Sequence, residues 1–117
     1  MPENTREAII AASKELLQEM RSANGVEIDS VTCIIFTLTR DLNAAFPAAA
    51  AREMGWTQTA LLCGSEIDVP DSMPRCLRIL MLFNTEKTNE EIAHVYLRGT
   101  EGLREDADKP WSIEDEA

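Results

Sequence analysis

The run Val31–Leu38 constrains the fold more than any other stretch, because its residues are apolar or β-branched almost throughout. Branched side chains pack well on a pleated strand, and an apolar run without polar alternation is typical of a strand covered on both faces. Other elements must then cover it. For a chain of 117 residues we predict one domain of mixed α/β (α+β) class, with helices packed on a mixed sheet.

An amphipathic helix is predicted ahead of this strand. Asn4 and Glu7 have the spacing of a capping box at a helix start. Asn24-Gly25 is a typical helix end, because glycine readily adopts the left-handed conformation found there. Between these ends the apolar residues fall on one helical face: Ile9, Ala12, Leu16, Leu17 and Met20.

After the central strand, helix and strand signals continue to alternate. An alanine-rich stretch over 44–54, with Pro47 near its start, predicts a second helix that ends at Gly55. Two further strands are predicted over 57–63 and 75–83. The residues between them are rich in glycine, proline, serine and aspartate and predict a loop.

The last third of the chain gives weaker signals. Thr88 and Glu91 have capping-box spacing and predict a short helix that includes Ile92 and Val95. A final strand over 97–103 is a weaker prediction, because Gly99 and Gly102 disfavour it. We expect the domain to span 1–104 and the acidic residues 105–117 to form a solvated tail. Whether Trp111 in this tail docks on the domain stays open.

The charge of the chain excludes several classes of partner. The sequence has 21 acidic and 11 basic residues, a formal net charge of −10. Nucleic acids and anionic membranes both require a basic surface, so neither is expected. Most of the basic residues are arginines, which bind carboxylates through paired hydrogen bonds. An anionic ligand would therefore require several arginines gathered at one place.

The cysteines and the N-terminus point to a cytoplasmic protein. We find no apolar run long enough to span a membrane and no signal-peptide pattern. Cys33, Cys63 and Cys76 are odd in number and widely spaced, which argues against a disulfide framework and against a zinc site. We expect Cys33 and Cys76 to be buried thiols.

Few residues suit acid–base or nucleophilic catalysis. The sequence has no glycine-rich phosphate loop, no nucleophile elbow and no zinc-protease motif. Its one histidine, His94, is by base rate a packed or surface residue rather than a catalyst. The sequence thus predicts either a binding protein or an enzyme whose reaction needs no proton transfer. No metal or cofactor is expected.

Three polar residues stand in apolar surroundings. Arg78 lies in the middle of an apolar strand, and arginine is seldom buried without a partner. Glu66 follows a strand end, where residues often line sites, and Tyr96 is the sole tyrosine. Each also has an ordinary explanation: an outward-facing arginine, a surface carboxylate, and a tyrosine whose hydroxyl points to water.

Several segments in order resemble one known family. The resemblance runs from about residue 4 to residue 106, and its most specific part matches T-x-T-x-D-L-x-A-x-F-P-A. The segments are TLTRDLNAAFPA (37–48), REMGW (52–56), CGSEIDVP (63–70), CLRIL (76–80), HVYL (94–97) and LR (103–104). They are similar to the trimeric bacterial chorismate mutases of the pseudo-α/β-barrel type.

This resemblance implies the pericyclic rearrangement of chorismate to prephenate, which requires no base, nucleophile or cofactor. Catalysis would come from holding the reactive conformer and placing positive charge beside the ether oxygen. By the resemblance, Arg78 faces that oxygen and a carboxylate. Glu66 and the Cys63 segment take the ring hydroxyl, and Tyr96 helps to hold a carboxylate.

The resemblance also implies a homotrimer whose sites lie between subunits. Arg52 and Arg104 would lie near the mouth of each site, and Ala49 stands where some relatives have lysine. The residues expected to line the pocket are Phe46, Ala48, Leu61, Leu62 and Leu103.

The sequence departs from the family pattern at both ends. The family begins with a strand similar to I-R-G-A-T-T-V, whose arginine binds a substrate carboxylate, but here Met1-Pro2-Glu3 precedes the Asn-Thr segment. Glu105 replaces a proline. The leading hypothesis is therefore a chorismate mutase that is either impaired or recorded without its first strand. The rival is a non-catalytic trimeric binder of chorismate, prephenate or an aromatic product, and a third alternative is the same fold with an unrelated ligand.

Overall fold

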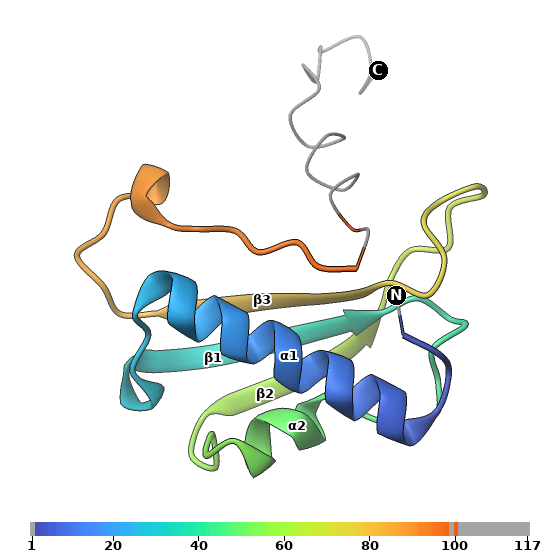
Figure 1. The fold of residues 1–117 in the computed structure, drawn as a ribbon, viewed down its shortest axis with the longest axis horizontal. Helices are drawn as coiled ribbons and strands as arrows, with labels where there is room; N and C mark the ends of the chain where they lie inside the picture. Colours follow the sequence, from blue (N-terminus) through green and yellow to red (C-terminus); the bar gives the residue numbers. More distant parts are fainter. Residues whose placement is uncertain (1, 99, 101–117) are drawn as a thin grey trace, which may run out of the picture.

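Two helices and a mixed sheet make up the described part of the chain (Figure 1). A computed structural model describes residues 2–98 and residue 100. The elements in chain order are α1 (Arg6–Asn24), the 3₁₀ turn η1 (Ile28–Ser30), β1 (Val31–Leu38), α2 (Ala48–Glu53), β2 (Ala60–Ser65), β3 (Leu77–Phe83) and the 3₁₀ turn η2 (Asn89–Glu91). No helix among these residues is long and apolar enough to cross a membrane.

The sheet has the order β2-β1-β3, so the apolar strand of the sequence lies at its centre. β1 pairs parallel with β2 and antiparallel with β3. The predicted mixed sheet with packed helices is therefore confirmed, with three strands in the described residues. The register places Phe36 opposite Cys63 on one side and opposite Ile79 on the other.

Both helices pack on the same face of the sheet. The core cluster joins Leu17 of α1, three alanines of α2 and the β1 residues Ile34 and Phe36. Ile34, Phe36 and Trp56 are completely buried. This packing of an apolar helical stripe on an apolar strand accounts for most of the stability of such a fold.

The opposite face of the sheet is exposed in the single chain. Cys33 and Ile35 on this face of β1 are half-buried. The prediction that β1 is covered on both faces is thus wrong for the single chain, as is the prediction that Cys33 is buried, because both helices cover the other side. Leu62, Leu80 and Leu82 share this face and are 61%, 56% and 50% exposed. Together these five residues are called the open sheet face.

Helix α1 begins one residue later than predicted. Its N-cap is Thr5, whose side chain accepts a hydrogen bond from the Ala8 N–H at 3.1 Å. Asn4 instead accepts from the N–H groups of Asn43 and Ala44, at 2.9 and 3.0 Å. The asparagine therefore ties the N-terminus to a distant turn and leaves the cap to Thr5. Gly25 ends the helix as predicted, with φ 61°.

The outer strands also differ from their predicted bounds. β2 begins at Ala60, which pairs with Cys33, so that residues 57–59 lie before the ladder between β1 and β2. β3 begins at Leu77, because Arg75 has φ 45° and cannot continue a strand. The predicted start of β2 is thus three residues early, and that of β3 two residues early.

The chain after β3 differs most from prediction. The capping box of Thr88 and Glu91 is present, but it opens only the 3₁₀ turn η2. From Ile92 the backbone is extended (φ −78°, ψ 126°), so the predicted helix through Val95 is wrong. The predicted strand at 97–103 is also absent at Leu97 and Arg98, since Arg98 has φ 54°. The acidic tail 105–117 and Trp111 lie outside the described residues.

Candidate active site

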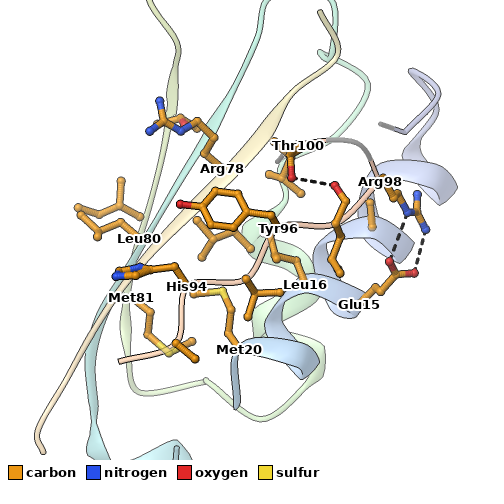
Figure 2. Close-up of a pocket in the computed structure, with 18 of the residues that line it drawn as sticks. Glu15, Leu16, Met20, Arg78, Leu80, Met81, His94, Tyr96, Arg98 and Thr100 are labelled. Carbon is orange, nitrogen blue, oxygen red and sulfur yellow. Dashed lines mark hydrogen bonds and ion pairs between the residues drawn. The ribbon is translucent and has the colours of Figure 1, made fainter. Parts of the chain in front are cut away.

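A cleft of about 490 Å³ lies between α1, β3 and the segment 92–98. This segment, which we call the strap, runs past β3 in the upper part of Figure 1. The floor of the cleft is mostly apolar and comes from Leu16 and Met20 of α1 and from Leu80 and Met81 of β3 (Figure 2). Its polar groups at the β3 side include Thr37, Glu66 and Arg78.

Strand register brings Arg78 and Glu66 together across the central strand β1. Arg78 is opposite Thr37 in the antiparallel pair of β1 and β3. The parallel pair of β1 and β2 ends beside it, and the Glu66 N–H continues that pairing by donating to the Leu38 carbonyl at 2.9 Å. The side chain of Glu66, just beyond the end of β2, therefore extends across β1 to Arg78 on β3.

These side chains form one hydrogen-bonded cluster. Arg78 Nη1 donates to Glu66 Oε1 at 3.2 Å, and the Thr37 hydroxyl donates to Glu66 Oε2. The Arg78 side chain is 56% exposed and that of Glu66 22% exposed. A guanidinium has five N–H donors, so the contact with Glu66 leaves donors for an anionic ligand. Glu66 thus orients the guanidinium of Arg78. The pair is not buried in a core, so the guanidinium remains accessible to a ligand.

Tyr96 faces this cluster from the strap. Its ring is half-buried and projects into the cleft, toward the β3 residues Arg78 and Leu80 (Figure 2). His94 also lines the cleft but is exposed. The cleft thus combines an apolar floor with an oriented arginine, a carboxylate and a phenol. Such a set suits a small apolar ring that carries carboxylate and hydroxyl groups.

The other residues expected at the site lie elsewhere in the single chain. Ala48 belongs to the core cluster, and Leu61 and Cys63 of β2 pack against that cluster. Arg52 and Phe46 are exposed, and Phe46 is 74% exposed. The following residues were expected at the site but do not line this cleft: Phe46, Ala48, Ala49, Arg52, Leu61, Leu62 and Cys63. Leu103 and Arg104 lie outside the described residues.

The turn before β3 contains a second polar cluster that sequence reasoning missed. Asp41 accepts the Arg75 N–H with both carboxylate oxygens, at 2.9 and 3.1 Å, and also accepts from the Thr39 hydroxyl. That hydroxyl oxygen accepts the Cys76 N–H at 2.9 Å. The bond from Thr39 is the main cause of a lowered pKa of Asp41, and burial raises the pKa of the Cys76 thiol. Asp41 belonged to a recognised motif, but nothing local indicated its partner.

Comparison with known proteins identifies the family. The family model for chorismate mutase type I matches residues 1–107. The chain belongs to this family. Chorismate mutase AroH of Thermus thermophilus is 46% identical over 105 residues, a stretch that covers 89% of this chain and 86% of that relative. Chorismate mutase AroH of Bacillus subtilis is 35% identical over 104 residues, or 88% of this chain and 82% of the relative.

A solved structure of this kind supports the fold. A chorismate mutase from Clostridium thermocellum superposes with a TM-score of 0.84 at 53% sequence identity. The match covers 86% of this chain and 90% of that structure. The resemblance drawn from the sequence motifs is therefore confirmed at the level of family and fold.

Proposed function

We propose that this protein is a chorismate mutase, an isomerase that converts chorismate to prephenate on the route to phenylalanine and tyrosine. The observation that carries the proposal is the oriented pair of Arg78 and Glu66 at an apolar cleft faced by Tyr96. Membership of the chorismate mutase type I family supports it over most of the chain. The rival reading, a non-catalytic binder, has no comparable support.

The reaction suits a site without a catalytic base. The carbon–oxygen bond of the enol ether breaks while a carbon–carbon bond forms within the same molecule, so no proton is transferred. Negative charge develops on the ether oxygen as its bond breaks. The Arg78 guanidinium, held by Glu66, supplies fixed positive charge for that oxygen, and preorganised charge of this kind is usually the largest single contribution to catalysis.

The remaining groups hold the substrate in its reactive shape. Glu66 accepts a hydrogen bond from the ring hydroxyl, and Tyr96 donates to a carboxylate. The apolar lining of the cleft packs against the ring. Holding a compact conformer in this way removes the entropic cost of reaching it in solution.

We also propose a homotrimer with sites between subunits, located in the cytoplasm. The leucines of the open sheet face are at least half exposed in the single chain, and a neighbouring subunit would cover them. Arg52 and Phe46 do not line the cleft of their own chain. In the proposed trimer they line the cleft of a neighbouring subunit. The free thiols Cys33, Cys63 and Cys76 suit a reducing compartment.

The proposal is tested by incubating the purified chain with chorismate. We expect saturable loss of chorismate absorbance, with prephenate as the one product found by chromatography. Binding of chorismate or prephenate by calorimetry without turnover would favour the non-catalytic binder. If the chain neither binds nor converts chorismate, the third alternative remains: the same fold with an unrelated ligand.

A further inference from the structure

Asn24, the last residue of α1, is polar yet 6% exposed. Its amide group Nδ2 donates to the carbonyls of Met20 and Ala93, each at 3.0 Å. Its Oδ1 accepts the Ala93 N–H at 2.8 Å. The side chain thus pairs with both backbone groups of Ala93, 69 residues away, as a neighbouring strand would. A buried amide requires such partners, and separating them would leave unpaired polar groups.

A second polar contact also joins α1 to the strap. At the other end of the strap Arg98 bonds to Glu15 of α1, with N–O distances of 3.0 and 3.4 Å (Figure 2). The Asn24 contact is the more buried of the two, since the side chains of Arg98 and Glu15 are 39% and 44% exposed. Exposed ion pairs contribute little, so Asn24 is the stronger tie.

No strand pairing with the sheet holds the described residues of the strap in place. In the described part of the chain, residues 92–97 form no strand pairing with β3, and the cleft separates the two. Segments with few backbone hydrogen bonds open locally at low free-energy cost. Tyr96 lies between the two tied positions, Ala93 and Arg98, and projects into the cleft.

We propose that Asn24 is the positioning residue for Tyr96: it fixes the strap to the end of α1 and so sets where the phenol meets the ligand. The hydrogen bonds and the burial of Asn24 support its role in positioning the strap. Its kinetic consequence rests on the proposed function. Helix capping explains the bond of Asn24 to Met20 but not the two bonds to Ala93, which lead away from the helix.

The kinetic test compares Asn24→Ala with Gln18→Ala. Gln18 is an exposed residue of the same helix whose side chain bonds to Ser22. Because a carboxylate contact acts on substrate and transition state alike, Asn24→Ala should raise KM about tenfold and change kcat less than about twofold. Gln18→Ala should leave both unchanged. An unchanged KM in Asn24→Ala would overturn the inference.

A double-mutant cycle separates positioning from general structural damage. Once Tyr96→Phe has removed the hydroxyl, adding Asn24→Ala should raise KM by less than about twofold. If Asn24→Ala has its full effect in both backgrounds, it does not act through Tyr96, and the inference is wrong.

A measurement without substrate keeps this inference separate from the proposed function. Tyr96 is the sole tyrosine, so selective ¹³C labelling of tyrosine gives one set of ring signals in an NMR spectrum. We expect Asn24→Ala to shift these signals and to average them toward those of a free side chain, while Gln18→Ala leaves them in place. Unmoved signals would refute the positioning role. A clear shift in a protein that does not convert chorismate would refute only the proposed function.

A second variant applies if Asn24→Ala does not fold. Ala93→Pro removes the N–H that donates to Asn24 and leaves α1 untouched. Ala93 is exposed, and the extended backbone of Ile92 suits a following proline. The same rise in KM and the same shift of the tyrosine signals are expected, and their absence in this folded variant would contradict the proposal.

Discussion

At the scale of single residues, the turn before β3 depends on Asp41. Arg75 has φ 45°, a conformation that is unfavourable for a residue with a Cβ atom. The carboxylate of Asp41 accepts the Arg75 N–H, and Thr39 accepts that of Cys76. These bonds fix the backbone just before Arg78. A side chain outside the cleft therefore helps to define the start of the strand that carries Arg78, the proposed source of catalytic charge.

The first prediction concerns Asp41→Asn and pH. The folded-state pKa of Asp41 is lowered, chiefly by the hydrogen bond from Thr39, so its carboxylate stabilises the fold above the unfolded pKa of about 3.9. This contribution is lost as pH falls through the lower folded-state pKa. We expect Asp41→Asn to lower Tm at pH 7 and to lower it less at about pH 2.5.

Thermal melts of wild type, Asp41→Asn and Asp68→Asn at a series of pH values would measure this difference. Asp68 is an exposed residue of the 66–76 loop and serves as a control. A Tm difference between wild type and Asp41→Asn that stays constant over the whole series would show that the charge of Asp41 does not stabilise the turn.

At the scale of elements, the end of α1 depends on backbone conformation rather than packing. Gly25 has φ 61°, and a Cβ atom placed there would meet nothing within 4 Å. Gly25→Ala should therefore destabilise the fold by about 1 kcal/mol through left-handed strain alone. The matched change Gly64→Ala, where there is also open space and no such φ, should not destabilise it. Urea unfolding of both variants measures the comparison, and equal destabilisation would contradict it.

The elements also show what the sequence could predict. The bounds of β1 agree with its apolar run, and the helix end at Gly25 agrees with its glycine, because both signals are local. The prediction of a helix through Val95 is wrong, because the capping box at Thr88 opens only a 3₁₀ turn and Ala93, just beyond it, bonds to Asn24 instead. Asn24 and Ala93 are 69 residues apart in the sequence, and no local sequence pattern indicates such a tertiary contact.

The candidate site was predictable in part for the same reason. Arg78 and Glu66 stood out as charges beside apolar runs, but neither their pairing nor their reaction followed from the residues alone. The resemblance supplied both roles, and the strand register supplied the contact. Thr37 escaped notice because a threonine is ordinary in a β-branched strand, although its hydroxyl donates to Glu66.

At the scale of the whole molecule, the open sheet face predicts assembly. We expect light scattering at micromolar concentration to show a homotrimer. Leu80→Asp would place a charge on this face, where Leu80 is 56% exposed in the single chain, and should shift the protein toward monomer. Ala11→Asp, on an exposed position of α1, should not. A monomeric wild type, or a trimer that tolerates Leu80→Asp, would contradict the proposed assembly.

The most direct test of the account is the turnover of Arg78→Ala. Arg78 would place positive charge where negative charge develops in the transition state, so its loss should lower kcat for chorismate about 10²–10³-fold. Arg6→Ala removes an exposed arginine from the first turn of α1 and should leave kcat unchanged. Both variants would be measured by loss of chorismate absorbance after their folding and assembly have been checked. If Arg78→Ala is folded and turns over chorismate as fast as Arg6→Ala, the proposed mechanism is wrong.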